Sequence, residues 1–210
     1  MSQPVFFYVL SAIEIFAVIA FAVSGITAAL RAEMDFVGIC FVAGVSAFGG
    51  GTIRDLLLDR RPFFWVEQDG LLWLVIALCL VCSFFIRKSH VELTEKWIQI
   101  PDAVGLGLFA ALGTQVALIE GASVTVAILM GVISSTLGGV LRDTFCNVVP
   151  KAFSDHQPYV ILAVFGSVIV VGFDAVNIMP GLGLILAVGV TTVGRLLVLS
   201  LNLSIPAWRA

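Results

Sequence analysis

A six-residue pattern occurs twice in this sequence, each time inside a long apolar stretch. The first copy is Gly50-Gly51-Thr52-Ile53-Arg54-Asp55, and the second, 88 residues further on, is Gly138-Gly139-Val140-Leu141-Arg142-Asp143. A charged residue at the centre of a membrane helix costs about 2.5–3.5 kcal/mol on insertion scales, so such residues normally face the interior of a helix bundle. A costly polar pair that recurs in two apolar segments indicates a repeated unit with a function.

The composition is that of an integral membrane protein. Hydrophobic residues make up 60% of the 210 residues and charged residues 12%, and the mean hydropathy is +1.12. Soluble domains carry about 25% charged residues. The apolar runs are long and unbroken, whereas the strands of a membrane β-barrel alternate apolar and polar residues in short segments. We therefore expect a bundle of helices in a lipid bilayer, and no nucleic-acid partner because no basic patch is present.

Seven apolar segments are each long enough to cross a hydrocarbon core of about 30 Å, which takes about 20 helical residues. They cover approximately residues 5–30, 36–58, 70–87, 100–119, 122–146, 158–174 and 178–200. The hydrophilic stretch 88–99 is predicted to link a first three-helix unit (5–87) to a second one (100–174), and 178–200 is the seventh helix. Because each unit has an odd number of helices, the second unit must be inverted relative to the first.

A gapless register supports this repeat. At the offset of 88 residues, Glu14 falls opposite Asp102, and identical residues fall opposite each other at five further places: Phe21-Ala22 and Phe109-Ala110, Gly25 and Gly113, Ala29-Leu30 and Ala117-Leu118, Ser46 and Ser134, and Pro62 and Pro150. Self-similarity at a fixed offset marks a duplicated unit. Inverted repeats build transport proteins around a twofold axis in the membrane plane. The sequence therefore favours a channel or a transporter.

Basic residues are unequally divided between the alternating loops. Cytoplasmic loops carry the excess of Lys and Arg in most membrane proteins. With the N-terminus outside, only Arg60 and Arg61 lie in the outer loops. We therefore expect the N-terminus outside and the C-terminus in the cytoplasm. The basic residues then placed on the cytoplasmic side are Arg31, Arg87, Lys88, Lys96, Lys151 and Arg209.

Glycines precede both Arg-Asp pairs. Gly49-Gly50-Gly51 and Gly138-Gly139 lie inside predicted helices, although glycine destabilises a helix in water by up to about 1 kcal/mol relative to alanine. One interpretation is close helix packing, which small residues permit. The other is a bend or an unwound turn that exposes backbone carbonyl groups to an ion. Three consecutive glycines are more than packing usually needs, which favours the bend.

The first arginine needs an acidic partner. Adjacent residues on a helix point about 100° apart, so the sequence predicts that Arg54 does not face Asp55. Glu14 lies in the outer half of the first helix, at the depth of Arg54. We therefore predict an ion pair between Arg54 and Glu14. The alternative is that both side chains reach towards lipid headgroups.

The second arginine repeats this pattern near the opposite face. Arg142 is predicted to pair with Asp102 and not with the adjacent Asp143. Arg195 is alone in the last apolar segment. We expect it to reach the cytoplasmic interface, and the alternative is that it faces the interior of the bundle.

Taken together, these features resemble a known family. The doubled G-G-x-x-R-D pattern, each copy followed by a proline (Pro62 and Pro150), is similar to that of bacterial membrane proteins built from two glycine-transporter domains. These proteins are relatives of the trimeric intracellular cation (TRIC) channels, and the resemblance covers residues 8–200. It implies an all-α fold of three, three and one helices, with the second and fifth helices bent at the glycines. It also implies a homotrimer with one pore per protomer, in the bacterial inner membrane.

Two functions remain open on this basis. The resemblance implies passage of monovalent cations, mainly potassium, while the name of the domain reflects transport of glycine. No catalytic motif, metal-ligand cluster or phosphate-binding loop occurs in the sequence, so neither an enzyme nor a cofactor is expected. In either case the pathway should run between the two glycine motifs, lined by carbonyl groups and small polar side chains. The predicted pore and gate residues are Glu14, Ser46, Gly49, Gly50, Gly51, Thr52, Arg54, Asp55, Asp102, Ser134, Ser135, Gly138, Gly139, Arg142 and Asp143.

Overall fold

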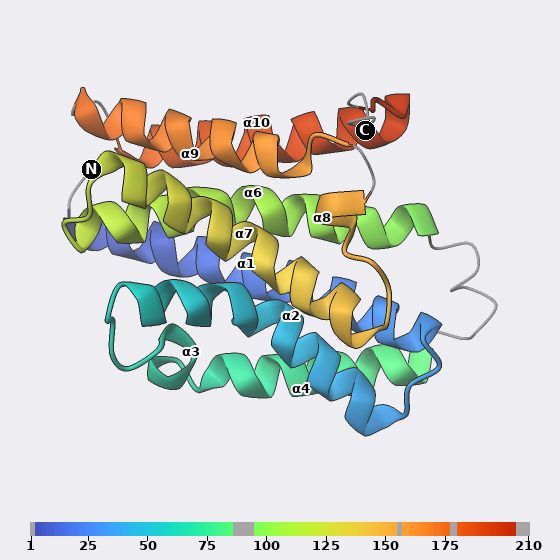
Figure 1. The fold of residues 1–210 in the computed structure, drawn as a ribbon. Coiled ribbons are helices and arrows are strands. Elements are labelled where there is room, and N and C mark those ends of the chain that lie inside the picture. The colour runs from blue at the N-terminus through green and yellow to red at the C-terminus, as the bar shows by residue number, and fades with distance from the viewer. Residues whose placement is uncertain (1–2, 86–94, 155–156, 177–179, 205–210) are drawn as a thin grey trace.

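The computed structural model describes residues 3–85, 95–154, 157–176 and 180–204, and every regular element in these ranges is a helix. Helices α1, α2 and α4 belong to the first predicted unit, helices α6, α7 and α9 belong to the second, and α10 follows them (Figure 1). Two short helices, α3 and α8, lie between the long ones. The bounds are α1 (Gln3–Arg31), α2 (Phe36–Leu57), α3 (Phe64–Glu67), α4 (Gly70–Phe85), α6 (Glu95–Ile119), α7 (Val124–Phe145), α8 (Lys151–Ser154), α9 (Tyr159–Ala175) and α10 (Pro180–Leu201).

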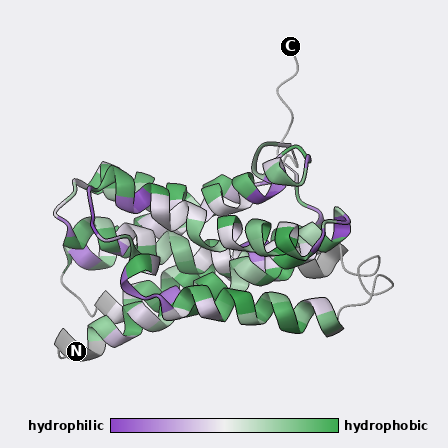
Figure 2. Ribbon diagram, turned by 90° about the horizontal axis from the view of Figure 1, so that it is seen from below, coloured by the Kyte–Doolittle hydropathy of each residue, from purple (hydrophilic) through white to green (hydrophobic). Residues whose placement is uncertain are grey.

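The surface of the bundle is apolar along the helices. Figure 2 shows hydrophobic residues over the length of the bundle and hydrophilic residues gathered towards its two ends. Large side chains such as Trp73, Phe84 and Phe165 are more than half exposed, which a water-facing surface would rarely allow over so wide an area. Among the described helices, α1, α2, α6, α7 and α10 are long and apolar enough to cross a membrane, and α4 and α9 are shorter apolar helices. The chain is an all-helical membrane protein.

The two groups of three helices run in opposite directions. In Figure 1, α1 and α6 run antiparallel through the middle of the bundle, as do α2 and α7, and α4 and α9 lie in its two outer layers. Helix α10 packs beside α9 and against α6. The C-terminal ends of α2 and α7 therefore lie at opposite ends of the bundle.

The buried face of α2 is repeated in α7. Ten positions of α2 are buried, and the ten buried positions of α7 are their equivalents at the offset of 88 residues. In α2 they are Ile39, Val42, Ala43, Ser46, Ala47, Phe48, Gly50, Gly51, Arg54 and Asp55, and in α7 they are Ala127, Met130, Gly131, Ser134, Ser135, Thr136, Gly138, Gly139, Arg142 and Asp143. The two helices therefore bury the same face of the repeat inside the bundle.

The same repeat governs how these two helices end. Asp59 and Asn147 are equivalent residues, and both have a positive φ, of 54° and 56°. The next amide along bonds back to the carbonyl oxygen of Asp55 in one case (2.8 Å) and of Asp143 in the other (2.9 Å). This is the left-handed helix termination that satisfies the last carbonyl groups of a helix. The chain therefore leaves both Arg-Asp pairs by the same turn.

The predicted helix bounds agree with the observed ones to within two residues, with one exception. Helix α6 begins at Glu95, inside the stretch 88–99 that was predicted as a linker. The prediction followed hydropathy, which marks where a helix enters lipid and not where its hydrogen bonding begins. Parts of several predictions lie outside the described residues: 86–94 at the linker, 178–179 before the last helix, and Arg209. Helices α3 and α8 are additional elements that hydropathy does not predict.

Candidate functional site

Helices α2 and α7 touch backbone to backbone at the glycines. A Cβ atom on Gly50 would clash with the carbonyl oxygen of Ser134, and a Cβ atom on Gly138 would clash with the carbonyl oxygen of Ser46. These four residues form two equivalent pairs at the offset of 88 residues. Only glycine lets two helix backbones approach so closely. The crossing of α2 and α7 is therefore a main-chain contact.

Of the two forms of interruption considered for the glycines, the unwound turn does not occur, because neither helix unwinds at this point. Both α2 and α7 are continuous helices through their glycines, although the axis of α2 changes direction near its middle (Figure 1). The three glycines of α2 meet three different neighbours. A Cβ atom on Gly49 would lie 2.7 Å from the Leu141 side chain, one on Gly50 would meet Ser134, and one on Gly51 would lie 2.5 Å from the Phe64 ring. Consecutive helical residues point in different directions, so each glycine admits its own close neighbour.

One buried arginine cluster lies beyond the crossing, near the C-terminal end of α2. The Arg54 cluster consists of Glu14, Arg54, Asp55 and Gln68. Arg54 is fully buried, its Nε donates a hydrogen bond to Asp55 Oδ1 (2.8 Å), and its Nη2 lies 2.7 Å from the same oxygen. The Arg54 Nη2 atom lies 3.8 Å from Glu14 Oε1, and Glu14 Oε2 accepts a hydrogen bond from Gln68 Nε2 (3.1 Å). The guanidinium group also lies 5.5 Å from the centre of the Phe64 ring.

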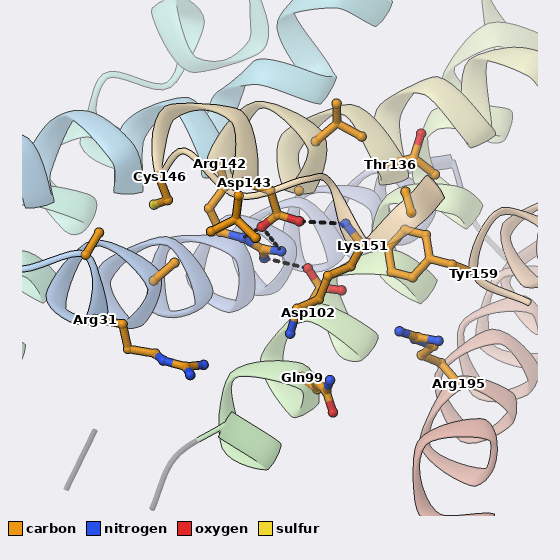
Figure 3. Close-up of a pocket in the computed structure, with 16 residues that line it drawn as sticks. Arg31, Gln99, Asp102, Thr136, Arg142, Asp143, Cys146, Lys151, Tyr159 and Arg195 are labelled. Carbon is orange, nitrogen blue, oxygen red and sulfur yellow. Dashed lines mark hydrogen bonds and ion pairs between the residues drawn. The ribbon is translucent and has the colours of Figure 1, made fainter. Parts of the chain in front are cut away.

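The equivalent cluster lies at the other end of the bundle, near the end of α7. The Arg142 cluster consists of Ser24, Asp102, Arg142 and Asp143. Arg142 Nε donates a hydrogen bond to Asp143 Oδ1 (2.9 Å), and its Nη1 donates to Asp102 Oδ1 (2.6 Å) and to Ser24 Oγ (2.5 Å). Figure 3 shows Arg142 directed towards Asp102, with Asp143 beside it.

Each arginine thus meets the acidic residue predicted from the repeat. The contacts of Arg54 with Glu14 and of Arg142 with Asp102 are confirmed. The prediction that adjacent residues do not pair is wrong for both motifs, because the three methylene groups of an arginine side chain can carry its guanidinium back across the 100° between neighbouring Cβ atoms. Neither arginine reaches towards headgroups, since both are buried.

The aspartates of the two motifs also hold the short helices. Asp55 Oδ2 accepts a hydrogen bond from the amide of Phe64 (2.9 Å), and Asp143 Oδ2 accepts one from the amide of Lys151 (3.0 Å). Phe64 and Lys151 are the first residues of α3 and α8, where amide groups lack partners within the helix. Each aspartate therefore joins a buried arginine to the loop that follows its helix.

A cavity of about 500 Å³ opens beside the Arg142 cluster (Figure 3). Its lining combines cationic and acidic side chains with an aromatic ring, and Gly139 forms part of its wall. The ionisable lining residues are Arg31, Asp102, Arg142, Asp143, Cys146, Lys151, Tyr159 and Arg195. A cavity of this size with several charged groups on its wall can hold water and solvated ions.

Arg195 lines this cavity, and its predicted position at the interface is wrong. The residue is only 2% exposed. Its Nη1 donates a hydrogen bond to Gln157 Oε1 (2.7 Å), and its guanidinium group lies 4.9 Å from the centre of the Tyr159 ring. An arginine packed against an aromatic face and an amide can remain buried instead of extending to water. Helix α10 therefore contributes to the cavity as well as covering the bundle.

The small polar residues predicted to line a pore fall into two groups. The hydroxyl groups of Ser46 and Ser134 are buried at the α2–α7 crossing. Within the described ranges, neither hydroxyl group forms a hydrogen bond. Ser135 bonds to a carbonyl group of its own helix (2.8 Å), as does Thr52 (2.7 Å). Thr52 also accepts a hydrogen bond from Trp65 Nε1 (2.9 Å), and both residues line an apolar hollow between α2 and α7. The structure thus groups the predicted arginines, acids and glycines around α2 and α7, and Thr52 lines the apolar hollow together with Gly49.

Sequence reasoning missed several residues of these clusters. Ser24, Gln68, Gln157 and Tyr159 all contact a predicted residue or Arg195. The two glutamines stand in the polar loops after Pro62 and Pro150, which is a weak signal for a role at the helix ends. Nothing in an apolar segment distinguishes Ser24 from the other small residues around it.

Comparison with known proteins places the chain in a family. The glycine transporter family matches residues 11–87 and 99–175. A UPF0126 membrane protein of Vibrio cholerae is 32% identical over 196 residues, which cover 93% of this chain and 81% of that protein. The UPF0126 inner membrane protein YadS of Escherichia coli K12 is 31% identical over 157 residues, or 75% of each chain.

Solved structures give the same result. The structure of the TRIC trimeric intracellular cation channel orthologue from Rhodobacter sphaeroides is similar with a TM-score of 0.86 and 34% identity, over 93% of this chain and 99% of that chain. A second structure, described in a study of conductance through TRIC cation channels, is similar with a TM-score of 0.83 and 28% identity, over 95% of this chain and 97% of that chain. The chain therefore belongs to the glycine transporter (UPF0126) family of membrane proteins and has the fold of the TRIC cation channels.

Proposed function

We propose that this protein is a channel for monovalent cations, mainly potassium, in the bacterial inner membrane. Seven helices cross the membrane, as two inverted repeats (5–87 and 100–174) followed by the helix at 178–200. The hydrophilic stretch 88–99, in which α6 begins, joins the two repeats. The opposite directions of α1 and α6, α2 and α7, and α4 and α9 support this arrangement. A homotrimer with one pore per protomer is proposed from the similarity to a trimeric intracellular cation channel orthologue.

The proposed pathway runs along the α2–α7 crossing from one arginine cluster to the other. With the N-terminus outside, the Arg54 cluster is the outer gate, the Arg142 cluster is the inner gate, and the cavity is the cytoplasmic vestibule. The backbone contact of Gly50 with Ser134 and of Gly138 with Ser46 closes the pathway between them, so this is a closed conformation. When the helices separate, the hydroxyl groups of Ser46 and Ser134, which have no partner among the described residues, become oxygen ligands for a passing cation.

One observation carries this proposal: two buried arginine–carboxylate clusters lie at opposite ends of one helix crossing, in a fold shared with cation channels. A buried ion pair is a weak source of stability, because desolvation of the charges offsets most of their attraction. Two equivalent ion pairs in an otherwise apolar bundle are therefore better explained by a role in gating than by a contribution to stability.

The test is recording from purified protein in planar lipid bilayers with KCl. Unitary potassium currents are expected from the wild type. Arg54→Ala and Arg142→Ala should change the open probability, because each removes the cation that holds one gate. Arg61→Ala is the matched control, since Arg61 is exposed and stacks on Phe63 at 4.3 Å. An absence of unitary currents from folded wild-type protein would refute the proposal.

The alternative is a secondary transporter of glycine or another small amino acid, which the name of the matched family suggests. In that case the same crossing would bind a zwitterion and open alternately to the two sides. Saturable glycine uptake into liposomes, without single-channel events, would establish this alternative.

A further inference from the structure

The two arginine clusters are equivalent in sequence but differ in their hydrogen bonds. Arg142 Nη1 donates to both Asp102 and Ser24. Within the described residues, neither Nη1 nor Nη2 of Arg54 makes a hydrogen bond of good geometry, and Nη2 lies 3.8 Å from Glu14. Asp55 remains the close partner of Arg54, as Asp143 does for Arg142. The difference therefore lies on the side of each arginine that faces the other helices of the bundle.

Ser24 accounts for one part of this difference. It lies on α1, in the first repeat, is fully buried, and reaches the arginine of the second repeat. The equivalent position in the second repeat is Leu112 on α6, which is also buried but has no hydrogen-bonding group. No equivalent hydroxyl group is therefore available to Arg54 from α6.

We propose that Ser24 is a positioning residue that holds the Arg142 gate closed, so that the Arg142 gate limits opening and the Arg54 gate opens first. A hydrogen bond to a charged group shifts an equilibrium constant by about tenfold or more. Arg142 has this additional bond and a direct bond to Asp102, whereas the Arg54–Glu14 contact is longer than a hydrogen bond. The inference rests on the proposed channel function.

Two gates in series give a clear prediction. A cation passes only while both gates are open, so the open probability is set mainly by the tighter gate when the looser gate is open most of the time. Weakening the tighter gate raises the open probability almost in proportion, while weakening the looser gate changes it less. The cluster in which a substitution changes the open probability more is therefore the limiting gate.

The experiment compares single-channel recordings of wild type, Ser24→Ala, Ser24→Thr, Glu14→Gln and Ser167→Ala in potassium chloride. Ser24→Ala should raise the open probability about tenfold with unchanged unitary conductance, and Ser24→Thr, which keeps the hydroxyl group, should restore the wild-type value. Glu14→Gln should have a smaller effect than Ser24→Ala. Ser167→Ala is the matched control, because Ser167 is fully buried and its hydroxyl group has no partner among the described residues.

A second readout does not depend on conduction. In detergent micelles, Ser24→Ala should speed amide hydrogen exchange in residues 142–148 and leave residues 54–60 as in the wild type. Absence of wild-type currents would refute the channel but not this asymmetry. The inference is overturned if Ser24→Ala behaves like Ser167→Ala in both assays, or if Glu14→Gln raises the open probability more than Ser24→Ala does.

Discussion

Replacing Gly50 by alanine should force α2 and α7 apart at the centre of the bundle. The new Cβ atom would clash with the carbonyl oxygen of Ser134, which belongs to the helix backbone and cannot rotate away. The two helices must separate by roughly 1 Å to restore ordinary van der Waals contact. Overpacking of this kind costs about 1–3 kcal/mol. For a chain of this size, the melting temperature should then fall by roughly 2–12 °C, at about 2–4 °C per kcal/mol.

The assay is thermal denaturation of the purified protein in detergent, followed by size-exclusion chromatography. Gly44→Ala is the matched control, because Gly44 lies on the same helix and has no atom within 4 Å of an added Cβ atom. Alanine raises helix stability by up to about 1 kcal/mol at either position. The difference between the two variants therefore isolates the clash with α7.

The equivalent substitution on the other helix sharpens the test. Gly138→Ala should cost about as much as Gly50→Ala, since it meets the carbonyl oxygen of Ser46 in the same way. The double variant should lose less than the sum of the two, because one separation of the helices relieves both clashes. Equal melting temperatures for Gly50→Ala and Gly44→Ala would refute the backbone contact as the joint between the repeats.

Two further predictions concern charges and turns. Asp102→Ala should destabilise the protein by about 3 kcal/mol, because it leaves Arg142 buried with one carboxylate fewer. Arg60→Ala should destabilise it by less than about 1 kcal/mol and only at low salt, since the ion pairs of Arg60 are longer (3.9–4.0 Å) and partly exposed. Melting curves at low and high salt check both, and an equal loss in the two variants would contradict the reasoning. Asn147→Ala should lower the free energy of unfolding by about 1–2 kcal/mol, because Asn147 has a φ of 56°. Asn147→Gly should be neutral or stabilising. A melting temperature of the glycine variant below that of the alanine variant would argue against the left-handed turn.

Hydropathy and the offset of 88 residues predict much of this fold. They give the long helices to within two residues at nearly every end, because burial in lipid demands apolar runs of a set length. The offset also pairs Arg54 with Glu14 and Arg142 with Asp102, since equivalent positions in two repeats occupy equivalent depths. The structure brings both pairs together.

The remaining contacts depend on the shape of side chains and on tertiary packing. The angle between neighbouring Cβ atoms is a poor guide for arginine, whose long side chain folds back onto Asp55. The sequence favours a bend at the glycines, and it does not reveal that α2 has a close neighbour in three directions, for each of which a glycine is needed. Ser24 and Leu112 occupy equivalent positions, and only the packing of α1 against α7 shows that one of them meets a guanidinium group.

Asp55 and Asp143 each accept a hydrogen bond from an arginine with one carboxylate oxygen and a hydrogen bond from a loop amide with the other. The amide lies nine residues ahead of Asp55 and eight residues ahead of Asp143. Surface connections normally tolerate insertions and deletions. In these two connections, an added or missing residue would displace the amide, draw the carboxylate with it and leave a guanidinium group inside the membrane with a weaker counterion. The length of each short connection is therefore fixed, because the buried arginine keeps its counterion only at that length.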